Sequence, residues 1–265
     1  MAKAVGKVIL SGEHAVVYGI PAIALPILGC QATTKIVENN QRGLIIKAPQ
    51  LDKTYHLDEH KIPYSPIELT VINFFKKFNL PIKNNISLEI SSDIPISSGM
   101  GSGASISTSM IKALASFYNL NISKEDIFEQ VFEIEKIYHG NPSGIDPKVI
   151  VYEKPFYFIK NVKMEIININ AKFTIAIIDS GIRSSTKKVV EWVAEQKKLS
   201  PNKYDNIFQK INNITEKLKD ELNGNDITKI GDLIKLNHYY LQEMGVSNYQ
   251  LDRIVTVANE SGAEG

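Results

Sequence analysis

Residues 93–106 read Asp-Ile-Pro-Ile-Ser-Ser-Gly-Met-Gly-Ser-Gly-Ala-Ser-Ile and lie between a strand-like run, 86–90, and an amphipathic helical pattern. Gly99, Gly101 and Gly103 permit positive φ angles and close approach of a ligand to the backbone. The helix expected after them directs unpaired N–H groups and the positive end of its dipole at the same place. The stretch therefore predicts a phosphate site, and we expect a nucleotide polyphosphate there.

Two other interpretations of this stretch are open. Clusters of serine and glycine are common in plain turns. The spacing Gly99-x-Gly101-x-x-Ala104 also fits the dinucleotide fingerprint of NAD-binding oxidoreductases. That fingerprint requires its glycines directly after the strand, whereas residues 91–98, including Pro95, intervene here. A Walker A loop is excluded, because no Gly-Lys-Ser/Thr follows the glycines.

The composition is that of an ordinary globular chain. Its 265 residues are 43% hydrophobic and 22% charged, with 30 Lys and Arg against 29 Asp and Glu. This length suits one large domain or two modest ones. The near-zero net charge argues against nucleic-acid binding and against a polybasic membrane surface. We therefore expect small-molecule partners.

The single cysteine, Cys30, excludes an internal disulfide framework and a cysteine-rich zinc site, and we expect it in the core. The longest apolar stretch, 20–30, is interrupted by Pro21 and Pro26 and is shorter than the ~20 residues of a membrane span. No signal peptide is recognisable at the N-terminus. These features predict a cytoplasmic protein.

Short runs typical of strands alternate with helical patterns along the chain. Strands are predicted at 5–10, 22–25, 33–37, 44–47, 86–90 and 173–178. Apolar residues recur at helical spacing in three sets: Ile106, Met110, Ala113 and Phe117; Ile207, Ile211, Ile214, Leu218 and Leu222; and Ile227, Ile230, Leu233 and Ile234. A domain boundary is predicted within 161–170, which separates an N-terminal domain, 1–165, from a C-terminal domain, 166–265.

Polar groups directly follow the first predicted strand, in Gly6-Lys7-Val8-Ile9-Leu10-Ser11-Gly12-Glu13-His14. Strand alternation can place the Lys7 ammonium on a face otherwise short of charge, near Glu13 and His14 at the strand end. An edge lysine that extends its amine to solvent fits the pattern equally well.

A second polar segment begins where a predicted helix runs into a loop at 139–147. Ser123 and Asp126 form a capping-box start for this helix. Glu135 falls at the edge of the buried stripe formed by Ile127, Val131, Ile134 and Tyr138, whereas Glu129 and Glu133 face the opposite way. Pro147 favours an extended conformation at Asp146, which would fix the direction of its carboxylate. Loop aspartates are also common turn formers.

Two further motifs have simple alternatives. His56-Leu57-Asp58-Glu59-His60 matches an inverted zinc-peptidase pattern, but that pattern requires a helix, so we expect a surface loop. Arg183 follows the predicted strand 173–178 and is either a phosphate contact or a surface residue.

Three segments together resemble the GHMP kinases, and among them the branch that phosphorylates mevalonate. They are Lys7 to Gly19, Pro95 to Ala104, and His139-Gly140-Asn141-Pro142-Ser143-Gly144-Ile145-Asp146, and they occur in the family's order over nearly the whole chain. The resemblance implies a two-domain α+β fold, with an N-terminal ribosomal-protein-like α/β domain that contains a left-handed βαβ unit and a C-terminal ferredoxin-like α+β domain. It further implies ATP at the glycine loop, Mg²⁺, and transfer to the 5-hydroxyl of mevalonate.

The same resemblance implies a role for each matched residue. Asp146 would be the catalytic base with Lys7 as its partner, and Glu13 and His14 would line the substrate. Glu135 would hold Mg²⁺ between the β- and γ-phosphates, with Ser102 as a second metal ligand. The residues implied to bind ATP are Pro95, Ser97, Ser98, Gly99, Met100, Gly101, Ser102, Gly103 and Ala104.

The sequence departs from the family in two places. Gly103 stands where the family has a second, metal-binding serine, so Ser102 or a water would have to substitute. Residues 261–265 resemble the approach to a third glycine-rich motif, and we expect the C-terminal sheet to be incomplete without it. Another small-molecule GHMP kinase such as a phosphomevalonate kinase, an ATP-binding relic without turnover, and an NAD-binding oxidoreductase are the alternatives. Members of the family are often dimers, which leaves a homodimer open here.

Overall fold

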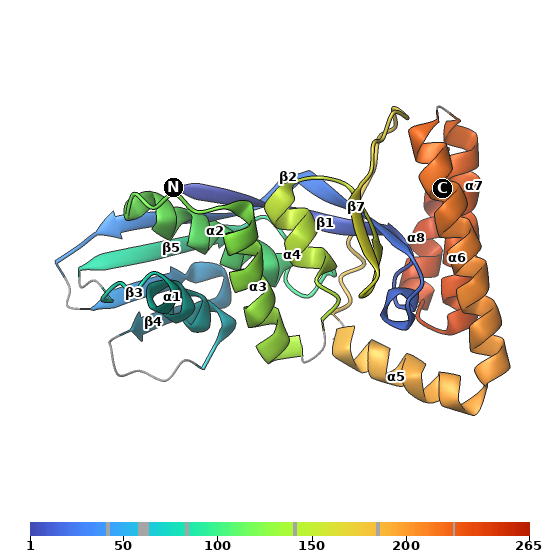
Figure 1. Ribbon diagram of the computed structural model, residues 1–265. Coiled ribbons are helices and arrows are strands. Elements are labelled where there is room, and N and C mark those ends of the chain that lie inside the picture. The colour runs from blue at the N-terminus through green and yellow to red at the C-terminus, as the bar shows by residue number, and fades with distance from the viewer. Residues whose placement is uncertain (41–42, 58–63, 83–84, 140–141, 184–185, 225) are drawn as a thin grey trace. The chain divides into compact units, whose positions relative to one another are not determined.

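The computed structural model describes all residues except 41–42, 58–63, 83–84, 140–141, 184–185 and 225 (Figure 1). The chain forms two compact units. Unit 1 contains residues 1–7 and 26–153, and unit 2 contains residues 8–25 and 154–265. The contacts thus group residues 154–165 with the C-terminal part, whereas the sequence places the boundary after them.

The strands of unit 1 are built around β5 (Ile86–Ser92). It pairs in parallel with β3 (Leu44–Ala48) and antiparallel with the second half of β2 (Ala22–Glu38). β4 (Lys53–Leu57) pairs with β3, and β1 (Ala2–Ser11) pairs with β2. A short 3₁₀ helix, η2 (Pro49–Leu51), joins β3 to β4.

Helices α1 (Pro66–Lys77), α2 (Ser102–Phe117), α3 (Lys124–His139) and α4 (Ile145–Tyr152) pack on one face of these strands (Figure 1). Helix α2 packs on the sheet through its stripe of apolar residues. Met110 and Ala113 are buried, and Ile106 and Phe117 pack partly buried on the same helix, as the spacing predicts. Burial of apolar surface of this kind is the main force that holds a helix against a sheet.

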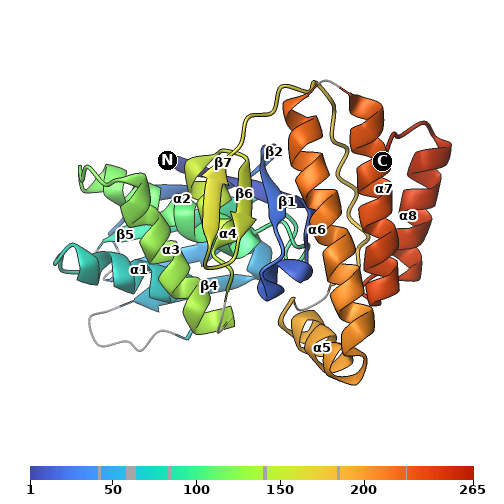
Figure 2. The same ribbon diagram turned by 45° about the vertical axis from the view of Figure 1, so that its right-hand side comes forward.

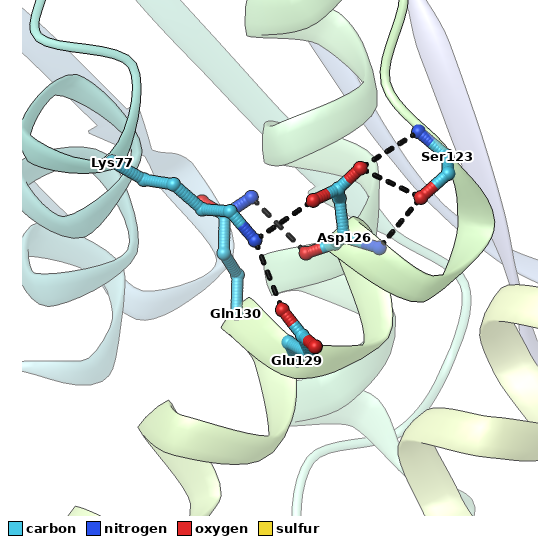
Figure 3. A network of polar contacts seen from close by, with 5 residues as sticks. All are labelled: Lys77, Ser123, Asp126, Glu129 and Gln130. Carbon is cyan, nitrogen blue, oxygen red and sulfur yellow. Dashed lines mark hydrogen bonds and ion pairs between the residues drawn. The ribbon is translucent and has the colours of Figure 1, made fainter.

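The start of α3 carries the capping box that the sequence predicts, and a lysine of α1 joins it (Figure 3). The Ser123 hydroxyl donates to Asp126 Oδ2 at 2.6 Å, and the Asp126 N–H donates to Ser123 Oγ at 3.0 Å. Lys77 Nζ lies 3.0 Å from Asp126 Oδ1 and 3.1 Å from Glu129 Oε2. Hydrogen bonds from Ser123, and then from Lys77, lower the pKa of Asp126 to about 2.

Unit 2 combines the antiparallel end of the sheet, β6 (Phe156–Ile159) and β7 (Lys163–Ile166), with a set of helices. The first half of β2 pairs with β6, which pairs with β7. After η1 (Ala15–Tyr18), the helices are α5 (Thr186–Leu199), α6 (Pro201–Asn223), α7 (Ile227–Met244) and α8 (Tyr249–Glu260). Helices α6, α7 and α8 run side by side (Figure 2), and every apolar residue of the predicted α6 stripe is buried. None of the described helices is both long and apolar enough to cross a bilayer.

The predicted strand at 173–178 is wrong. This segment belongs to no sheet in the part of the chain that the structure describes, and Ile175, Ile177 and Ile178 are 41–56% exposed. Strand patterning indicates only that a segment suits a sheet, and a strand forms only where a neighbour accepts its hydrogen bonds. Among described residues, no such neighbour is present.

Two smaller expectations also change. Cys30 is only partly buried, because the stretch of β2 around Leu28 and Gly29 is exposed. The two strands predicted at 22–25 and 33–37 are parts of the single strand β2. Its ends pair with different neighbours, β6 and β5, so each end has its own apolar pattern.

Replacement of Ser123 by alanine should lower the free energy of unfolding by about 1 kcal/mol, the usual cost of a lost N-cap. Because the folded-state pKa of Asp126 lies near 2, below its ordinary 3.8, this contribution is present above about pH 4 and disappears as the pH falls through 2. Urea denaturation at several pH values measures it.

Ser116 is exposed on α2 and serves as the control, with Ser116→Ala expected within about 0.5 kcal/mol of wild type. An equal loss in both variants would contradict the capping account.

Candidate active site

Lys7 is a buried charge on β1, with only 5% of its surface exposed. Its Nζ lies 3.0 Å from Asp146 Oδ1, and its backbone N–H donates to the Met100 carbonyl at 3.0 Å. A buried ammonium is costly unless an anion pairs with it, so Asp146 is required by the burial of Lys7. Strand β1, the glycine loop and α4 therefore meet at this lysine.

Asp146 lies in the first turn of α4, which contradicts the extended conformation predicted from Pro147. Gly144 caps the helix with φ +82°, and the buried residues Ile145 and Pro147 flank the aspartate. Proline is tolerated in a first turn because the N–H groups there have no intrahelical acceptor. The positive end of the helix dipole also favours a carboxylate at this position.

Glu135, in the last turn of α3, completes a cluster of three charged groups. Burial, and then the charge of Asp146, raise the pKa of Glu135 to about 8, while Lys7 opposes the shift. Glu129 and Glu133 are exposed, as predicted. With both carboxylates ionised, one ammonium faces two negative charges, so a cation would be favoured here.

The glycine loop leaves room above its backbone. Gly99 and Gly101 have φ angles of +78° and +72°, whereas Gly103 is part of α2, which corrects the expectation of a positive φ there. A Cβ added at Gly99 or Gly103 would meet no atom within 4 Å. At Gly101 it would lie 2.8 Å from Ile150 and 3.1 Å from the Lys7 side chain, so only glycine fits between them.

Helix α2 starts at Ser102 with no side-chain cap. By helix geometry, its first N–H groups lack intrahelical acceptors and are open to an anion. The Ser105 hydroxyl donates to the Val5 carbonyl at 2.6 Å and fixes the helix start on β1. At the other end of the loop, the Ser98 hydroxyl donates to the Pro95 carbonyl at 2.8 Å, and Ser97 adopts φ +56°.

Glu13 and His14 belong to unit 2, in the turn between β1 and η1. Burial lowers the pKa of His14 to about 4, so its imidazole is neutral at pH 7. Glu13 Oε2 accepts a hydrogen bond from Asn237 Nδ2 at 3.2 Å. Asn237 was not predicted as a site residue, because nothing in the α7 pattern distinguishes a buried asparagine that contacts a distant turn.

The structure describes only some of the remaining sequence candidates. Arg183 makes two 2.8 Å contacts with Asp179 in an exposed segment. His56 lies on β4. Residues 58–60 and 140–141, and the side chains of Tyr138 and His139, fall outside the described part of the structure. Within the described residues, no group of three or more His, Cys, Asp or Glu side chains is placed to hold a metal.

Comparison with known proteins agrees with this architecture. The family model for the GHMP kinases N-terminal domain matches residues 67–154, which include α1 to α4 and the glycine loop. The mevalonate kinase of Archaeoglobus fulgidus is 33% identical over 99% of this chain and 86% of its own length. The crystal structure of L. major mevalonate kinase in complex with R-mevalonate superposes with a TM-score of 0.82 at 25% identity, over 100% of this chain and 81% of that one.

Fold and site thus define the class of protein as a GHMP kinase with a two-domain α+β fold. A second curated relative, the mevalonate kinase of Methanocaldococcus jannaschii, is also 33% identical over 97% of this chain and 84% of its own. The chain belongs to the mevalonate kinase family.

Replacement of Glu135 by glutamine should remove a pH-dependent loss of stability. The folded protein keeps a proton on Glu135 that the unfolded chain releases between pH 4.5 and about 8, so the free energy of unfolding falls as the pH rises through that range. Because one pKa unit corresponds to about 1.4 kcal/mol, the variant should exceed wild type by a few kcal/mol at about pH 9 and match it at about pH 4.

Denaturant unfolding across pH measures the difference, with Glu133→Gln, an exposed position of the same helix, as control. Parallel stability curves for wild type and Glu135→Gln would show that the carboxylate titrates normally.

Proposed function

We propose that this protein is an ATP-dependent mevalonate kinase, which transfers the γ-phosphoryl group of ATP to the 5-hydroxyl of mevalonate in isoprenoid biosynthesis. The observation that carries the proposal is the 3.0 Å pair of Lys7 and Asp146 beside an open, amide-lined glycine loop. Phosphoryl transfer asks a protein mainly for positioning and charge neutralisation, and this arrangement supplies both. Mevalonate is proposed as the acceptor because the similar proteins are mevalonate kinases.

In this proposal, residues 95–104 hold the ATP phosphates. The N–H groups at the start of α2 lack intrahelical acceptors, and among the described residues no atom lies within 4 Å of a Cβ added at Gly99 or Gly103. The close packing of Gly101 on Lys7 places this backbone next to the ion pair.

A magnesium ion fits the chemistry of the same cluster. Glu135 is a half-buried carboxylate whose ionisation is opposed by desolvation and by Asp146, so a hard divalent cation would favour its charged form. Glu135 and the Ser102 hydroxyl are the ligands that this chain offers, since Gly103 has no side chain. When bound, the ion would neutralise charge on the β- and γ-phosphates.

Asp146 is the group that would take the proton. As the 5-hydroxyl oxygen bonds to the γ-phosphorus, the bond from that phosphorus to the β,γ-bridging oxygen breaks and ADP leaves. The hydroxyl proton passes to the Asp146 carboxylate, which Lys7 holds in place. The Lys7 ammonium also lowers the pKa of the hydroxyl and stabilises negative charge that develops on the transferred group. Glu13 and neutral His14 would contact the mevalonate. A homodimer and a cytoplasmic location stay predictions.

A coupled assay of ADP release with mevalonate, phosphomevalonate, homoserine and galactose tests the acceptor. We expect turnover with mevalonate. Activity on another acceptor with none on mevalonate would refute the substrate, and binding of NAD in place of Mg-ATP would refute the kinase.

Replacement of Asp146 by asparagine, or of Lys7 by methionine, should lower kcat by about 10²–10⁴-fold, because the proton acceptor or its partner is lost. The same coupled assay measures the rates, and circular dichroism checks the fold. Lys112, which pairs with Glu153 on the surface of unit 1, provides the control Lys112→Met with near-wild-type kcat. Near-normal rates in Asp146→Asn would remove this residue from the chemistry.

A further inference from the structure

A chain of buried polar side chains in unit 2 ends at Glu13. The hydroxyls of Ser11 and Thr215 lie 2.7 Å apart, Ser11 Oγ donates to Asn237 Oδ1 at 3.0 Å, and Asn237 Nδ2 donates to Glu13 Oε2 at 3.2 Å. Ser11 and Thr215 are fully buried, and Asn237 is 3% exposed. Buried polar groups are kept where their hydrogen bonds are made, so these side chains have little freedom to reorient.

The direction of each hydrogen bond follows from the carboxylate. An ionised Glu13 only accepts, so the Asn237 amide must turn its NH₂ toward Glu13 and its oxygen toward Ser11. Ser11 then donates its single proton to Asn237 Oδ1. The Thr215 hydroxyl, 2.7 Å from Ser11 Oγ, donates to the Ile211 carbonyl at 2.9 Å, so its one proton lies between these two acceptors. A flipped amide would place two oxygens against each other at Glu13.

Side chains of α6 and α7 are therefore connected by hydrogen bonds to the turn after β1. Thr215 is on α6 and Asn237 is on α7, whereas Glu13 lies more than 200 positions earlier in the chain. The amide of Asn237 gives the carboxylate a fixed donor on the side of Oε2. The bond fixes the plane of the carboxylate, and a carboxylate has lone pairs for several hydrogen bonds at once.

We propose that Asn237 is a positioning residue for substrate binding: it holds the Glu13 carboxylate in the orientation from which Glu13 accepts a hydrogen bond from a hydroxyl of the acceptor substrate. This inference rests on the proposed function. Asn237 acts through Glu13 and sets the affinity for the acceptor, while ATP binding and the phosphoryl-transfer step depend on unit 1 residues.

Two substitutions of Asn237 test this. Asn237→Asp keeps the shape and the acceptor oxygen for Ser11 but replaces the donor to Glu13 with a second acceptor, and Asn237→Ala removes both bonds. Loss of a hydrogen bond to a charged group should raise the KM for mevalonate about 10- to 100-fold. The KM for ATP should not change, and kcat should change far less than the mevalonate KM.

The control is Asn170→Asp, because Asn170 donates to Asn223 at the exposed surface of the same unit and carries the same charge change. Thermal unfolding of each variant separates loss of fold from loss of affinity. A purely structural role of Asn237 would lower Tm and affect both substrates together, which would overturn the proposal.

A double-mutant cycle with Glu13→Gln supplies the decisive comparison. If Asn237 acts through Glu13, the mevalonate KM of the double variant should be close to that of Glu13→Gln alone. If the effects of the two substitutions on the mevalonate KM are additive, or if Asn237→Asp has a wild-type KM, the inference about Asn237 is wrong. In either case, turnover of mevalonate by the wild-type protein would still support the proposed function. If the wild-type protein turns over none of the acceptors, both the proposed function and the inference about Asn237 are wrong.

Discussion

The site depends on one buried ion pair, between Lys7 and Asp146. Only 7% of the lysine side chain is exposed, against 28% of the aspartate side chain, so water shields the ammonium little and the carboxylate in part. Removal of one partner would leave the other charge buried and uncompensated, at a cost of about 3–5 kcal/mol. Three elements must therefore keep their positions relative to one another. β1 carries the ammonium and α4 carries the carboxylate. The glycine loop passes so close to them that residue 101 has no room for a Cβ.

The second feature of the site is its excess of negative charge. Glu135 and Asp146 share one ammonium, and burial resolves the conflict by keeping a proton on Glu135 until about pH 8. A polyphosphate on the neighbouring helix terminus would add further negative charge, which only a cation can balance. In the proposed function, these electrostatics would couple metal binding, nucleotide binding and proton transfer in unit 1.

Features set by nearby residues could be predicted from the sequence. The stripe of α2, the stripe of α6 and the capping box of Ser123 and Asp126 are confirmed, because each depends on residues a few positions apart. The pair of Lys7 and Asp146 depends on residues far apart in the chain. From the local pattern alone, Lys7 could be either a lysine near the polar groups at the strand end or an edge lysine that extends to solvent. The pairing of Lys7 with Asp146 was implied by the family resemblance.

Other features could not be predicted because they depend on distant or subtle contacts. The segment 173–178 has strand patterning but no described strand beside it, so pattern alone misled. The rule for residues before proline failed at Asp146, where the cap at Gly144 and the buried flanking residues favour helix. The hydrogen bonds of Asn237 have no signature in the sequence, since they join α7 to the start of the chain.

The most direct test of the central claim is a crystal structure with mevalonate and a non-hydrolysable ATP analogue bound together. We expect the 5-hydroxyl oxygen within hydrogen-bond distance, about 2.6–3.2 Å, of the Asp146 carboxylate, with the Lys7 ammonium beside it and the γ-phosphate over the glycine loop. A substrate hydroxyl bound away from this pair, with the triphosphate outside residues 95–104, would contradict the account.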